Sequence, residues 1–235
     1  MRFLSVSCDL PLTQQKPVST VRHMTDDRRS SIALIAGSAG MVFTMILHPR
    51  GIRLAPDQIE RIIRELFAVH GLALASLPLL FLGAWGLTRH VAKPDRLALI
   101  ALVFYGFAIA AILNGAVFDG LAMPTLLRQM VPGASSSIDQ WRTLFKYNAI
   151  VDEAYIRVFA VGSGAALVLW SASMLRSRSF SLGVAIYGLV LGAATVIGVL
   201  SGIVDPETHS FILVIFGESI WFIAAGARLW RVQQA

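Results

Sequence analysis

The chain has 235 residues, of which 56% are hydrophobic and only 14% charged, and its mean hydropathy is +0.68. Soluble domains carry about 25% charged residues, so this composition excludes an ordinary water-soluble globule. Several apolar runs of roughly 20 residues have the length of helices that cross a bilayer. The sequence therefore predicts an all-α membrane protein, a six-transmembrane-helix bundle that accounts for nearly all of the chain.

The formal net charge of +6 has a simple origin in such a protein. The basic residues lie in loops beside the apolar runs, as the positive-inside bias of membrane proteins requires. The charge therefore predicts the lipid bilayer as partner and no nucleic acid. Cys8 is the single cysteine, which excludes an intrachain disulfide and a cysteine metal cluster.

The first segment, residues 1–30, is mostly polar and contains Pro11 and Pro17. This composition predicts a disordered cytoplasmic tail without the apolar core of a signal peptide. Met24 opens a stretch that would itself begin a membrane protein sensibly, so residues 1–23 are either a translated tail or an over-extended gene start.

The membrane domain is predicted over residues 31–231. Its spans are expected at about 31–47, 67–87, 97–123, 147–175, 180–203 and 210–229. Gly37 and Gly40 in the first span would let another helix approach closely. Between the first two spans, residues 55–66 place Ile62, Ile63 and Leu66 on one side, which predicts a short interfacial amphipathic helix.

The fifth span has no charged residue and carries a stripe of small residues. Such stripes are typical of closely packed membrane helices, so this span is a candidate surface for a homo-oligomer. The stripe consists of Gly188, Gly192, Gly198 and Gly202.

The topology follows from the number of spans and the distribution of basic residues. Six spans put both termini on one side, and more of the 20 Lys and Arg residues lie on that side than on the other. The positive-inside bias then predicts a multi-pass protein of the bacterial inner membrane with both termini cytoplasmic. Trp85, Trp170 and Trp230 all fall at the proposed cytoplasmic boundary, where an aromatic belt is expected.

Polar residues inside the spans are concentrated toward the end opposite the termini. A carboxylate at membrane depth costs about 2.5–3.5 kcal/mol on insertion scales, so it normally faces a protein interior or a wet cavity. Asp119 and Glu218 are the strongest candidates, because neither has a basic residue within a turn of its own helix. The candidates for an outward-facing polar pocket are His70, Asn114, Asp119, Asn148, Asp152, Glu153, Arg157 and Glu218.

Two functional interpretations of this pocket remain open beside a structural one. The leading class is non-enzymatic: binding or passage of a small solute, an ion or a proton. The rival is a metal-dependent membrane hydrolase or a metal- or haem-binding protein, since imidazole and carboxylate ligate divalent metals such as zinc. The candidate metal ligands are His48, His70, Asp119 and His209.

In the structural interpretation, each polar group only satisfies a neighbour across the bundle, for example Asp119 by accepting from Asn148. Sharper motifs are absent from the sequence: it contains no H-E-x-x-H, no G-x-S-x-G and no phosphate-binding G-x-x-x-x-G-K. No catalytic residue is therefore assigned.

Three short patterns carry a family-level resemblance. His48-Pro49 follows the first span, Ala68-Val69-His70 lies in the second, and an Asp-Gly-x-Ala-x-Pro pattern at 119–124 ends the third. In these patterns the chain resembles a broad group of uncharacterised bacterial six-span membrane proteins, over roughly residues 31–127. The resemblance implies the six-helix architecture and carries no function with it.

Overall fold

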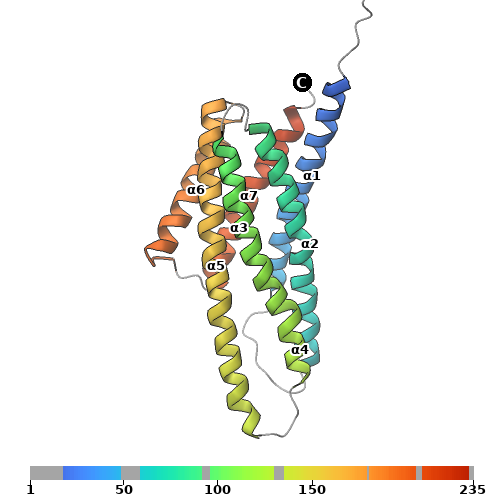
Figure 1. The fold of residues 1–235 in the computed structure, drawn as a ribbon, viewed down its shortest axis with the longest axis vertical. Coiled ribbons are helices and arrows are strands. Elements are labelled where there is room, and N and C mark those ends of the chain that lie inside the picture. The colour runs from blue at the N-terminus through green and yellow to red at the C-terminus, as the bar shows by residue number, and fades with distance from the viewer. Residues whose placement is uncertain are drawn as a thin grey trace, which may run out of the picture.

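The computed structural model describes residues 18–48, 59–91, 96–129, 135–178, 180–204 and 208–232, and the regular structure within these ranges is entirely helical (Figure 1). The elements are α1 (Val18–Leu47), α2 (Ile59–Val91), α3 (Leu97–Val117), the π-helical turn η2 (Phe118–Ala122), α4 (Met123–Arg128), α5 (Ser135–Ser177), α6 (Leu182–Leu200) and α7 (Thr208–Val232). The predicted all-α class is confirmed.

Six helical stretches are long and apolar enough to cross a membrane, which confirms the predicted bundle. They are Asp27–Leu47, Glu60–Val91, Leu97–Arg128, Thr143–Ser177, Leu182–Leu200 and Phe211–Arg231. The third stretch joins α3, η2 and α4 into one continuous span. Large apolar side chains cover the outside of the bundle, such as Phe107 at 66% exposure and Leu213 at 74%. Lipid is the solvent that such a surface fits.

Helix α1 begins earlier than the sequence predicted. The disordered tail was expected to reach Ser30, whereas α1 is already helical at Val18. Pro17 directly precedes the helix, and no further proline or glycine occurs before Gly37, so nothing stops the helix from extending outward. The hydroxyl of Ser31 donates to the Gly226 carbonyl at 2.6 Å, tying this part of α1 to α7. Residues 1–17, which include the rest of the predicted tail, lie outside the described residues.

The predicted interfacial helix is not confirmed as a separate element. From Ile59 onward its residues form the first turns of α2, while 55–58 lie outside the described residues. Ile62, Ile63 and Leu66 are buried in a small apolar cluster with Leu127 of α4. The amphipathic pattern therefore reflects packing of α2 against α4 inside the bundle.

Glycines bring α1 and α2 into close contact, as the sequence predicted for α1. A Cβ atom at Gly37 would stand 2.8 Å from the Leu80 backbone nitrogen. In the other direction, a Cβ at Gly83 would stand 2.6 Å from the backbone nitrogen of Leu34 and 2.9 Å from its Cα. The backbones of the two helices are in contact at these positions, so there is no room for a side chain larger than hydrogen.

A cluster of buried aromatic side chains packs between α3, α5 and α7. Trp170 of α5 stacks on Trp221 of α7 at 6.0 Å between ring centroids, with Tyr105 and Phe222 at their edges. Trp170 is fully buried and its Nε1–H donates to the Thr88 hydroxyl at 3.0 Å. The sequence prediction that Trp170 belongs to an interfacial aromatic belt is wrong, because its indole N–H finds its partner inside the bundle.

The glycine stripe of α6 is used within the chain. A Cβ at Gly188 would collide with Ser171 and Trp221, and one at Gly192 would collide with the Gly164 carbonyl. Gly202 differs from both, because it has a φ of 72° at the end of the helix. Packing against α5 and α7 accounts for Gly188 and Gly192, so a homo-oligomer would have to use another face of α6.

We expect Gly83→Ala to lower the free energy of unfolding by about 1–3 kcal/mol, the usual cost of forcing atoms into a packed site. Gly71→Ala on the same helix is the matched control, because nothing lies within 4 Å of a Cβ there. Equilibrium unfolding in mixed detergent micelles measures both variants. Equal destabilisation by the two substitutions would contradict the close α1–α2 contact.

Candidate functional site

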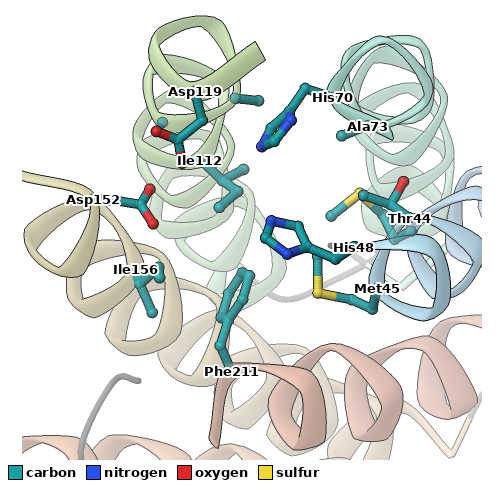
Figure 2. A pocket seen from close by; sticks show the side chains of 13 residues that line it. Thr44, Met45, His48, His70, Ala73, Ile112, Asp119, Asp152, Ile156 and Phe211 are labelled. Carbon is teal, nitrogen blue, oxygen red and sulfur yellow. The ribbon is translucent and has the colours of Figure 1, made fainter. Parts of the chain in front are cut away.

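A cavity of about 60 Å³ lies between the end of α1 and the first half of α2, and α3, η2, α5 and α7 complete its wall (Figure 2). Its polar lining consists of Thr44, His48, His70, Asp119 and Asp152, and apolar side chains complete the wall. Space for one water probe is about 10–15 Å³, so several waters or a small ion fit. Pockets for organic ligands measure about 300–1,000 Å³, so a molecule of that size does not fit.

His70 enters the cavity from α2 and is buried, with 6% of its surface exposed. Its Nδ1 lies 2.8 Å from the Leu66 carbonyl oxygen one turn earlier. A carbonyl oxygen can only accept, so Nδ1 carries a proton in this contact, and in the neutral form of the ring Nε2 is the acceptor. This is the arrangement in which histidine ligates metals, with the second nitrogen fixed by a backbone carbonyl.

His48 reaches the same cavity from the end of α1. Its ring centroid lies 5.5 Å from that of His70, with the two rings edge to face at 71°. Two segments that are separate in the sequence thus bring both imidazoles together. Figure 2 shows them facing Asp119 and Asp152.

Asp119 lies in the π-helical turn η2, a feature the sequence analysis missed. Within this turn the Met123 N–H donates to the carbonyl of Phe118, five residues back. Pro124 has no N–H to continue the α-helical pattern, so a widened turn relieves the mismatch. The proline four residues after Gly120 was the available signal, although it predicted only the end of a helix.

The widened turn also lets η2 approach α2. A Cβ at Gly120 would collide with the Cβ of His70, so glycine is required where His70 crosses the turn. Asn148 of α5 donates from Nδ2 to Asp119 Oδ1 at 2.8 Å. This hydrogen bond ties Asp119 to α5, and it is the contact that the structural interpretation expected.

Asp152 reaches the cavity from α5, one turn after Asn148. Gly115 of α3 makes room for it, since a Cβ there would stand 3.1 Å from Asp152 Oδ1. Asp152 is half-buried. Two carboxylates, from η2 and α5, therefore share one small cavity.

Glu218 lies outside the lining of this cavity. It is buried, with 3% of its surface exposed, and its Oε1 accepts from the Ser163 hydroxyl at 2.6 Å. Phe211, which does line the cavity, precedes it by about two turns of α7. The two strongest sequence candidates, Asp119 and Glu218, thus belong to two separate polar layers of the bundle.

Four further pocket candidates do not line the cavity, and one of them is Asn148, which contacts the site through its hydrogen bond to Asp119. Asn114 is exposed and donates to the Ala110 carbonyl at 2.7 Å within its own helix. Glu153 is half-buried and Arg157 exposed, both on α5. The side chain of His209 lies outside the described residues. The sequence analysis in turn missed Met41, Met45 and Phe211, because apolar wall residues give no signal of their own.

The predicted metal ligands are gathered only in part. His48, His70 and Asp119 reach one cavity, but among the described residues no group of three His, Cys, Asp or Glu side chains is close enough to hold a metal ion. A metal would therefore have to draw its ligands together. A haem does not fit a cavity of about 60 Å³.

No protein-family model matches the sequence, no curated protein resembles it, and no solved structure resembles its fold. The resemblance to bacterial six-span membrane proteins stays a prediction. The chemistry of the site therefore rests on its own geometry.

The surroundings of Glu218 lead to a test of its role. We expect Glu218→Gln to change the free energy of unfolding by less than about 1.5 kcal/mol, because volume is conserved and the amide oxygen can still accept from Ser163. Glu218→Ala opens a cavity and should cost about 2–5 kcal/mol. Ser163→Ala, which removes only the donor, should cost about 1 kcal/mol. Unfolding curves of all three proteins measure this, and a glutamine variant as unstable as the alanine variant would contradict a purely structural carboxyl group.

Proposed function

We propose that this multi-pass membrane protein binds a small cation in the cavity between α1, α2, η2 and α5. One observation carries the proposal: two carboxylates and two imidazoles share a cavity of about 60 Å³, and no lysine or arginine lines it in the described part of the chain. When both carboxyl groups are ionised, their negative charges repel each other in so small a volume, and a cation between them relieves that repulsion.

The nitrogen and oxygen donors in the cavity narrow the class of cation that it would bind. Alkali cations prefer oxygen alone, whereas imidazole nitrogen together with carboxylate oxygen suits divalent transition metals such as zinc or manganese. His70 supports this class, because its Nδ1 is held by Leu66 and its Nε2 is the acceptor left over. Binding would bring His48 and the carboxylates closer to that nitrogen. We therefore rank a divalent metal first among small cations.

Binding is better supported than passage. Phe211 lines the cavity and packs edge to face on Phe159, with ring centroids 5.6 Å apart. Transport past these two aromatic rings would need them to separate. A metal-dependent hydrolase remains the alternative, and it would need a metal held by three side chains with a position left open for water.

The orientation in the membrane follows from charge. With six spans, the start of α1 and the end of α7 lie on the same side, and the larger share of basic residues on that side supports a cytoplasmic location. The cavity lies at the other end and would open to the outside of a bacterial inner membrane. The cation would then come from that side.

We expect the detergent-purified protein to bind Zn²⁺ or Mn²⁺ in isothermal titration calorimetry. His70→Ala and Asp119→Asn should each weaken binding at least about tenfold, the effect usually seen when a metal site loses part of its support. Glu60→Gln is the matched control, because Glu60 is an exposed carboxylate at the same end of the bundle.

A second control distinguishes metal binding in the cavity from metal binding by the N-terminal segment, which contains Cys8 and His23. The double variant Cys8→Ser/His23→Ala should keep full affinity. Loss of binding in this variant, with none in Asp119→Asn, would place the metal outside the cavity. If only monovalent cations bind, the cavity is still a cation site, but the ranking of a divalent metal is wrong. If no cation binds, the proposal is overturned.

A further inference from the structure

A second hollow lies on the lipid-facing surface, on the other side of η2 from the cavity. It measures about 420 Å³ and runs between the first turns of α2 and the α4 segment, which lie side by side in Figure 1. Its apolar lining includes Phe67, Ala68 and Leu121, and two arginines, Arg64 and Arg128, line it as well. We call this hollow the α2–α4 groove.

The depth of the groove follows from the lengths of the spans. The stretches Glu60–Val91 and Leu97–Arg128 each contain 32 residues, or about 48 Å of helix. The hydrocarbon core is about 30 Å thick, so both stretches extend into the headgroup region at their ends. Arg64 lies in the first turns of one stretch and Arg128 ends the other. Both guanidinium groups therefore lie at headgroup level.

The two arginines are available for a ligand. Both are exposed, and neither forms a hydrogen bond or an ion pair with another described residue. Arg61, one turn before Arg64 at a similar depth, differs from them because its Nε lies 2.7 Å from Glu65 Oε1. Glu60, also on α2, makes no such bond to Arg64. The groove thus carries two arginines that form no ion pair with a described residue, beside an apolar floor.

We propose that the α2–α4 groove binds an anionic phospholipid, with the phosphate between Arg64 and Arg128 and an acyl chain along Phe67 and Leu121. Arginine recognises phosphate through two parallel N–H donors, and basic pockets between membrane helices are suited to anionic headgroups. Phe67 is 59% exposed and Leu121 41% exposed, so both offer apolar surface to a chain. A free phosphate would use only the arginines and leave this surface uncovered.

Native mass spectrometry of the full-length protein tests the proposal with phosphatidylglycerol as the probe and phosphatidylcholine as the neutral comparison. One basic residue near an anionic bilayer contributes about 1 kcal/mol, or about fivefold in affinity. Arg64→Gln/Arg128→Gln should therefore lower phosphatidylglycerol binding by about 25-fold and leave phosphatidylcholine binding unchanged. Arg61→Gln is the matched control and should change neither.

Two further experiments distinguish binding of a whole lipid from binding of a phosphate group alone. Ala68→Phe fills the groove without changing its charge and should also weaken phosphatidylglycerol binding, while glycerol phosphate without acyl chains should not compete. Equal binding of the two lipids to the parent protein would overturn the proposal. So would an Arg61→Gln variant as impaired as the arginine double variant, or full competition by glycerol phosphate. Circular dichroism of each variant establishes that the bundle is folded.

Discussion

The structure depends on one constraint: a polar group inside a bilayer must find its partner within the protein. The hydroxyl of Thr44 donates to the Gly40 carbonyl, and that of Ser76 donates to Leu72 in the same way. Longer-range bonds tie helices together, as Ser31 does with Gly226. Such bonds let α1, α2 and α7 pack closely, with glycines where the backbones meet.

In the cavity, hydrogen bonds within the described part of the protein do not by themselves satisfy all of the polar groups. Asp119 accepts a hydrogen bond from Asn148, yet Asp119 and Asp152 still bring two carboxylates to one small volume. Burying charged groups without compensation is costly, so the arrangement calls for water or a cation. Glu218 shows the contrast, because a single carboxyl group with a serine donor fits among packed side chains.

The π-helical turn η2 joins the cavity to the lipid-facing surface. Asp119 lines the cavity, Gly120 accommodates His70, and Leu121 lines the α2–α4 groove. Three successive residues thus form a wall between a polar site and a site at the lipid boundary. A shift of this turn would change both walls, and π-helical turns are frequent at functional sites.

The sequence by itself determined the fold class, the six membrane spans and the presence of polar side chains in a shared region of those spans. Apolar runs of sufficient length identify the spans, because backbone N–H and C=O groups in lipid must bond to each other and a helix satisfies them within one segment. The sequence also identified His70, Asp119 and Asp152 as candidates, because ionisable groups are rare at that depth. It also named His48 as a candidate metal ligand. Only the tertiary structure decided that these four side chains share one cavity and that Glu218 and Asn114 lie outside it. It also decided that Trp170 is buried and that η2 is widened. These features depend on which helix faces reach one another, and that is set by packing between segments far apart in the chain.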